Sequence, residues 1–153
     1  MNLDIYVALV AESETTLAES FRQVAQAHAD EGDVHFLCQT LATQCEARRA
    51  RLQPVIDRFE KRPADDEPER LDPPGLGAPR SGTLGMLRDL QDLYLLASLV
   101  DITWTMIDEA AQALQDTQLL EIVAACEKQT AVQLRWLQTR MRQAAPQALI
   151  AAP

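Results

Sequence analysis

Apolar residues recur at spacings of three, four and seven along most of this chain, which is the periodicity of an amphipathic α-helix. Four segments carry the pattern and predict helices over about 4–28, 34–60, 83–115 and 117–144. The first stripe consists of Tyr6, Val10, Leu17, Phe21 and Val24. Ala, Leu, Gln, Glu and Arg dominate the composition and favour helix over strand. The sequence therefore predicts an all-α protein.

Capping residues and prolines mark where these helices begin and end. Asp33 is expected to cap the second helix, and Asp116 or Thr117 the fourth, because short polar side chains accept the free N–H groups of a first turn. Pro54 lies inside the second helix and is expected to kink or locally break it. Pro146 is expected to end the fourth helix.

The segment 61–82 holds five of the eight prolines and is expected to be a long loop. Extended, its 22 residues reach up to ~70 Å, whereas the second helix is only ~40 Å long. It can therefore carry the chain back along the whole bundle. The expected architecture is one domain over 1–153, in which two antiparallel helix hairpins are joined by a long crossover, as in ferritin-like four-helix bundles.

The third helix is the most apolar, since its middle reads LYLLASLVDITWTMI. Such a helix is expected to be buried on more than one side, either because it is central or because it also forms a subunit interface. The tail 146–153 is apolar and uncharged and is expected to lie on its own bundle or on a partner. Both features predict a homo-oligomer, most simply a dimer.

Composition and charge narrow the class of protein. The chain has 153 residues, is 47% hydrophobic and has a net charge of −9, which argues against binding nucleic acid or an anionic membrane. The N-terminus has no basic region typical of a signal peptide, and no apolar run is long enough for a free-standing membrane span. The three cysteines lack metal-site spacing and are expected to be buried thiols in a reducing cytoplasm.

Acidic residues stand in or beside the apolar stripe of every helix. Glu14 and Asp101 lie inside the first and third stripes, and Glu46 and Glu127 flank the second and fourth. With the helix order, this pattern resembles the ferritin-like superfamily. The phrases LRDLQDLYLLASLVDITW and RWLQTRMRQAAPQAL look like a small family of uncharacterised bacterial ferritin-like proteins. The resemblance implies an iron or manganese pair held by Glu14, Glu46, Asp101 and Glu127.

The sequence departs from that family pattern at the two histidine positions. Arg49 and Thr130 stand three residues after the acids of the second and fourth helices, where a Glu-x-x-His ligand pair would have histidine. Arginine carries a fixed positive charge and does not ligate metals. We therefore expect the dimetal centre to be lost. Arg48 or Arg49 is expected to form a buried ion pair, bidentate to Glu14 or Glu127.

Three functions follow as hypotheses. The first is a non-catalytic oligomeric bundle that acts through a partner or ligand and holds no cofactor. The second is an iron or manganese oxidase with atypical carboxylate ligands. The third is a module that holds a small apolar ligand around Trp104 and Cys126. His28 and His35 flank the first turn, where a solvated turn is expected and a metal site is the alternative.

Overall fold

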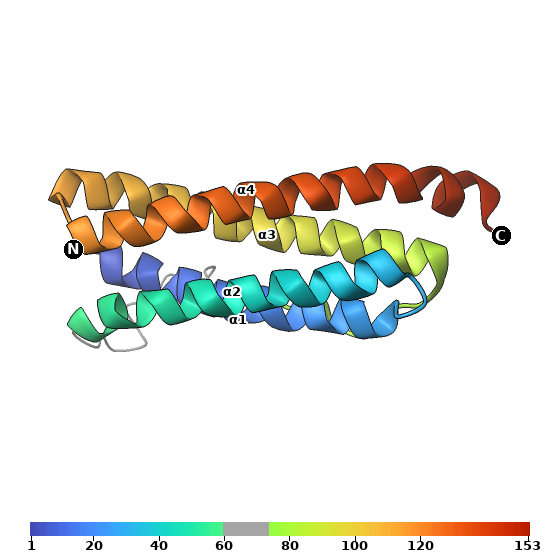
Figure 1. Ribbon diagram of the computed structural model, residues 1–153, viewed down its shortest axis with the longest axis horizontal. Coiled ribbons are helices and arrows are strands. Elements are labelled where there is room, and N and C mark those ends of the chain that lie inside the picture. Colours follow the sequence, from blue (N-terminus) through green and yellow to red (C-terminus); the bar gives the residue numbers. More distant parts are fainter. Residues whose placement is uncertain (60–73) are drawn as a thin grey trace.

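The protein is an all-helical bundle in the computed structural model, which describes residues 1–59 and 74–153 (Figure 1). In chain order its elements are α1 (Leu3–Ala27), α2 (Gly32–Arg58), α3 (Gly82–Leu114), α4 (Thr117–Pro146) and the short π-helix η2 (Gln147–Ala151). The described ranges contain no strand. The all-α prediction is confirmed. Each of the four predicted helices begins and ends within two residues of the observed helix.

Neighbouring helices of the bundle run antiparallel. At one end, His28 after α1 lies against Asp89 near the start of α3, with 2.8 Å between Nε2 and Oδ2. At the other end, Arg58 at the end of α2 donates to Asp116, the N-cap of α4, over 2.8 Å. The end of α2 and the start of α3 therefore lie at opposite ends of the bundle (Figure 1). Of the predicted loop over 61–82, residues 61–73 lie outside the described part of the chain.

The residues that follow, 74–81, form no helix or strand and lie along the bundle. Gln23 of α1 donates its side-chain amide to the Gly77 carbonyl over 3.0 Å. Arg80 donates to Asp89 and Asp92 of α3 over 2.7 and 2.8 Å. These contacts tie the segment to both α1 and α3.

Of the two aspartates predicted to cap helices, one caps its helix and the other binds a side chain of another helix. Asp116 caps α4 as predicted, since its side chain accepts from the Leu119 N–H over 3.1 Å. Asp33 does not cap α2, which begins one residue earlier with Glu31 as N-cap. Its carboxylate instead accepts from Arg140 of α4 over 2.7 Å. The cap prediction for Asp33 is wrong because a charged partner from α4 engages its side chain.

Neither internal proline ends its helix. α2 continues through Pro54 to Arg58, so the predicted local break does not occur. α4 includes Pro146 and passes into η2, where the Ala152 N–H donates to the Gln147 carbonyl over 2.8 Å. Each proline lacks the N–H that would bond to the carbonyl four residues earlier, but both lie within the last two turns of their helices, and after Pro146 the chain continues in the wider turn of η2.

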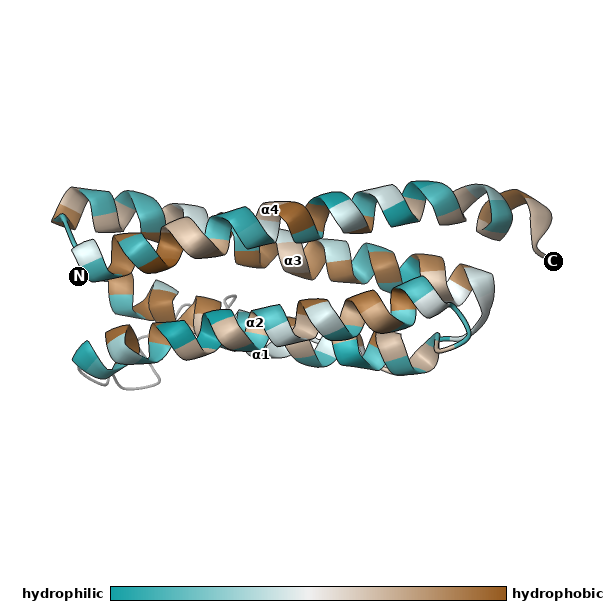
Figure 2. Cartoon of the chain, viewed as in Figure 1, coloured by the Kyte–Doolittle hydropathy of each residue, from teal (hydrophilic) through white to brown (hydrophobic). Residues whose placement is uncertain are grey.

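The C-terminal extension is only partly covered by the bundle. It projects past the other helices and carries apolar residues (Figure 2). Ala148 is buried, whereas Leu149 and Ile150 are 65% and 84% exposed. No helix in the described ranges combines the length and apolar character that a bilayer crossing requires.

α3 is amphipathic in the bundle rather than central. Leu93, Trp104 and Ile107 are fully buried on one side, and Leu95 and Ile102 on the other are 63% and 51% exposed. The expectation that α3 is central in its own bundle is therefore wrong. The subunit interface stays a prediction.

Candidate functional site

A buried ion pair joins α1 and α2 in the middle of the bundle. Arg48 Nε donates to Glu14 Oε1 over 2.6 Å, and Arg48 Nη2 donates to Glu14 Oε2 over 2.9 Å. Glu14 is 0% and Arg48 1% exposed. This is the side-on, bidentate geometry in which a guanidinium matches both oxygens of a carboxylate.

Side chains from α3 and α4 complete the hydrogen bonding of this pair. Trp104 donates its indole N–H to Glu14 Oε1 over 2.9 Å. Arg48 donates to the side-chain oxygens of Gln129 and Gln133, over 3.1 and 3.2 Å. All four long helices thus contribute to one group, which we call the central polar cluster: Glu14, Arg48, Trp104, Gln129 and Gln133.

Gln133 links the cluster back to α2. Its side-chain amide donates to the side-chain oxygen of Gln44 over 3.1 Å and lies 3.4 Å from the Leu41 carbonyl. Because Gln133 is completely buried, these contacts satisfy polar atoms that water cannot reach. Such a network makes one relative placement of α2 and α4 more favourable than its neighbours.

The charges of the cluster are stabilised by one another. Burial lowers the pKa of the Arg48 guanidinium, but the hydrogen bonds that it donates to Glu14 and the charge of Glu14 outweigh burial, so the net pKa is raised. Arg48 is therefore protonated at neutral pH. Arg48 Nη2 also lies 3.2 Å from Cys45 Sγ.

The three thiols are not activated. Burial, followed by the nearby charge of Glu14, raises the pKa of Cys45 to about 12. Burial is also the largest cause of the raised pKa of Cys38 and of Cys126, each about 12. A thiol that stays protonated at neutral pH is a poor nucleophile and a poor metal ligand. All three cysteines are free and buried.

The donor set around Glu14 does not suit a metal ion. Three N–H groups, two from Arg48 and one from Trp104, already bond to the two carboxylate oxygens. The guanidinium also places a permanent positive charge where a dication would have to bind. Iron or manganese would need those same oxygen lone pairs, so the residues present do not fit the dimetal group that the resemblance implies.

The structure does not bring the four acids together as one ligand set. Glu46 faces solvent, with its side chain 53% exposed, and binds Arg22 over 2.7 Å. Asp101 of α3 accepts from the hydroxyl of Thr130 over 2.7 Å. Within residues 1–59 and 74–153, no group of three or more His, Cys, Asp or Glu side chains could hold a metal ion. Arg49, the alternative partner for a buried acid, donates instead to Gln53 over 2.9 Å.

Glu127 lies in an acidic part of the surface between α3 and α4. Burial raises its pKa, and the charges of Asp108 and Asp101 raise it further, whereas a hydrogen bond from Thr105 acts in the opposite direction. Its ionised form is therefore less favourable in the folded protein than in water.

The histidines of the first turn face different partners. His28 is 3% exposed and contacts Asp89, so the expected solvated turn is wrong for this residue. His35 Nδ1 lies 2.7 Å from the Ala25 carbonyl. The two imidazole rings therefore have separate partners and do not converge on one metal position.

Sequence reasoning did not single out Gln129, Gln133 or Asp89. A usable signal existed for Gln133, which lies seven residues after Cys126 and four before Leu137 on the apolar stripe of α4. A polar amide on such a stripe indicates a buried partner. No comparable pattern marks Asp89, because its partner His28 is 61 residues away in the sequence.

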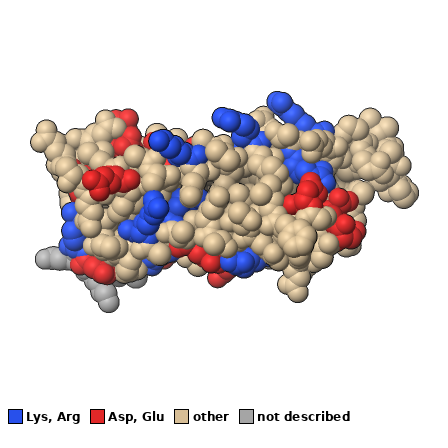
Figure 3. All heavy atoms as spheres, viewed as in Figure 1, with Lys and Arg blue, Asp and Glu red and all other residues tan. Residues whose placement is uncertain are grey.

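The surface carries charges of both signs. On the face seen in Figure 3, basic and acidic side chains are intermixed and much of the area carries neither.

A scan against protein-family models found no matching family, and comparisons with curated proteins and with solved structures found no match.

Proposed function

We propose that this protein is a non-catalytic, ferritin-like bundle that acts by binding a partner through the outer face of α3. The observation that carries the proposal is the bidentate Arg48–Glu14 pair at the centre of the bundle. In this interpretation the guanidinium supplies the positive charge that metal ions supply in ferritin-like oxidases, and the resulting pair is redox-inert. Its role is to specify how the helices pack.

The arrangement of the helices supports the ferritin-like part of the proposal. α1 lies against α2 and α3, and α4 lies against α3 and α2. With α2 ending and α3 beginning at opposite ends of the bundle, the connection has to be long (Figure 1). These are features of bundles with one crossover connection.

The outer face of α3 supports the binding part of the proposal. Its exposed apolar side chains are Leu84 (52%), Leu95 (63%), Ile102 (51%) and Met106 (43%). A monomeric surface rarely keeps several large apolar residues in a row, and such rows usually mark sites of protein interaction. We also propose that the protein functions in the cytoplasm, since its three cysteines are free and buried, as is usual in a reducing compartment.

One observation favours the oxidase alternative. Glu127, with its raised pKa, lies near Asp101 and Asp108, and a bound cation would relieve this crowding of carboxylates. That alternative therefore uses atypical ligands on α3 and α4 rather than Glu14.

Elemental analysis of protein purified without a tag or chelator separates the two functions. We expect iron and manganese far below one ion per chain, and no gain after incubation with Fe²⁺ or Mn²⁺. Near-stoichiometric metal that is lost in Glu127→Ala, but retained in Glu121→Ala, would overturn the proposal. Glu121 is the matched control because it is an exposed glutamate on the same helix.

A further inference from the structure

The outer face of α3 has a regular spacing of its own. Its exposed residues recur at intervals of three and four on either side of residues 98 and 99, the spacing at which two helices that coil slightly around each other stay in contact. We call this row the outer strip of α3. It consists of the exposed Leu84, Arg88, Gln91, Leu95, Ile102, Met106, Glu109 and Ala113, with the half-buried Ser98 and Leu99 at its centre.

The positions of the outer strip have the same spacing in both chain directions, although the residue types at matching positions differ. Its intervals are symmetric about a point between Ser98 and Leu99, so that position 95 corresponds to position 102 on reversal, and 88 corresponds to 109. A two-fold axis at that point would place two copies of α3 antiparallel, with Leu95 of each copy opposite Ile102 of the other. Two-fold interfaces require this kind of self-complementary patch.

From the side chains that this arrangement sets opposite one another, Leu95 with Ile102 and Arg88 with Glu109, we infer that the partner is a second copy of this chain, bound through the outer strip of α3 in antiparallel register. The inference rests on the proposed function, because it names the partner for the same face. The core of this interface consists of the Leu95–Ile102 pairs on either side of the two-fold axis, and charged residues lie toward both ends of the interface.

The charges at the ends of the strip are complementary only in this register. Arg88 and Glu109 are both exposed, and neither makes an ion pair with another described residue. An antiparallel pair of strips sets each Arg88 against Glu109 of the other copy, twice per dimer. A parallel pair would set arginine against arginine and glutamate against glutamate, which is repulsive.

An apolar pocket lies beside one end of the outer strip. At one end, α1 and α3 form a pocket of about 440 Å³ whose lining includes Tyr6, Met106, Ala113 and Leu114. In the antiparallel register, the exposed Leu84 of the second copy faces Ala113 at this pocket. An apolar side chain entering an apolar pocket is the usual anchor of an interface.

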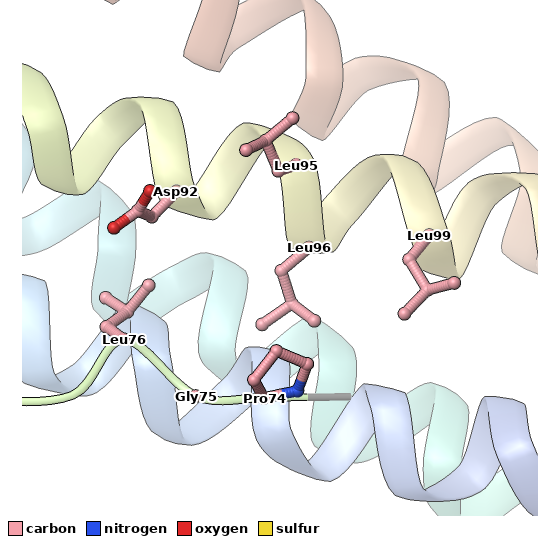
Figure 4. A pocket seen from close by; sticks show the side chains of 7 residues that line it. All are labelled: Pro74, Gly75, Leu76, Asp92, Leu95, Leu96 and Leu99. Carbon is pink, nitrogen blue, oxygen red and sulfur yellow. The ribbon is translucent and has the colours of Figure 1, made fainter. Parts of the chain in front are cut away.

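Residues 74–81, the described part of the neighbouring segment, leave Leu95 of the outer strip uncovered. A second pocket of about 280 Å³ lies where residues 74–76 run beside α3. Figure 4 shows Leu96 and Leu99 directed toward Pro74, whereas Leu95 extends away from it. Leu95 is therefore available to a second copy, in agreement with its 63% exposure.

Sedimentation velocity over a range of concentrations tests the inference. We expect a species of twice the 17.0 kDa chain mass. Arg88→Glu or Glu109→Arg alone creates two like-charge contacts per dimer and is expected to weaken dimerisation about tenfold. The double exchange, Arg88→Glu with Glu109→Arg, restores both contacts and is expected to return dimerisation close to that of the parent chain.

Arg135→Glu is the matched control, because it makes the same charge change at an exposed arginine on α4 and should leave dimerisation unchanged. Ile102→Asp tests the apolar centre and should give a monomer with unchanged helical circular dichroism, because Ile102 is 51% exposed and lies outside the cluster of buried core residues.

Three results would overturn the inference: a monomer at every concentration, a dimer that the single charge changes leave intact, or a double exchange weaker than either single change. The last result would exclude the antiparallel register itself. These failures are distinguishable from failure of the proposed function, since that is judged by metal content. A monomer that contains no metal would contradict the inferred dimer alone. A dimer that contains near-stoichiometric metal would contradict the proposed non-catalytic function alone.

Discussion

At the scale of single residues, the central polar cluster shows how a charged pair is retained inside an apolar bundle. Glu14 and Arg48 are both buried, and each carries a large desolvation penalty. The penalty is offset because Trp104 and Gln133 satisfy the hydrogen-bonding groups that the pair leaves over. The pair therefore makes a small net contribution to stability as a unit, whereas either charge alone would be strongly destabilising.

Arg48→Met leaves the Glu14 carboxylate buried without its partner. We expect the free energy of unfolding to fall by about 3–5 kcal/mol, the usual cost of breaking a buried pair. Denaturant unfolding followed by circular dichroism measures this change. Arg49→Met is the control, since the adjacent arginine donates to Gln53 at the surface and its loss should cost less than about 0.5 kcal/mol.

Adding Glu14→Gln to Arg48→Met should recover most of that loss. The buried charge is then absent, and the new amide oxygen still accepts from Trp104. A double variant as unstable as Arg48→Met would mean that packing of the Arg48 stem, rather than charge, holds the cluster together.

At the scale of helices, the ends of α2 and α4 are joined by one residue with two roles. Asp116 accepts from the Leu119 N–H, and it also binds Arg58 over 2.8 Å. The hydrogen bond from Arg58 is the largest cause of the lowered pKa of Asp116. A single carboxylate thus begins one helix and fixes the end of another.

Asp116→Ala should cost about 1 kcal/mol for the helix cap and up to about 1 kcal/mol more for the partly exposed ion pair. Asp116→Asn keeps an N-cap oxygen and loses only the charge, so it should cost less. Thermal or denaturant unfolding at neutral pH measures both. Equal losses in the two variants would show that the ion pair, and not the cap, is the important contact.

At the scale of the whole molecule, the excess of acid groups makes stability depend on pH. The net charge is −9, and different carboxylates respond to acid in opposite directions. Asp116, whose pKa is lowered in the folded state, loses its contribution as pH falls. Glu127, whose pKa is raised by burial and then by Asp108 and Asp101, binds a proton more readily when folded than when unfolded.

Glu127 therefore destabilises the fold at neutral pH, and this cost disappears as the pH falls below its unfolded pKa. Glu127→Gln should unfold at a higher temperature than the parent at pH 7, and the difference should vanish in acid. Glu121→Gln, at an exposed position on the same helix, is the control and should change little. A Glu127→Gln variant that is less stable at pH 7 would show that the Glu127 carboxylate has a partner that needs its charge.

The predictions from sequence succeeded where neighbouring residues decide the outcome. Helix positions follow from apolar stripes of period 3.6, and the cap at Asp116 follows from a side chain acting on its own first turn. The failures at Asp33 and His28 have a common cause, because Arg140 and Asp89 are far away in the sequence. The ligand set implied by the resemblance requires all four acids to face the interior of the bundle, whereas Glu46 faces solvent.

The sequence by itself determined an all-helical chain with four long helices, because helix formation depends on propensities and periodicities within short segments. Only the tertiary structure decided which polar groups share the interior. Arg48 rather than Arg49 binds Glu14, since the side chains of adjacent helical residues point about 100° apart and just one of them faces the core. Only the packed bundle also shows that α3 has an exposed apolar side, because exposure depends on which faces the other helices cover.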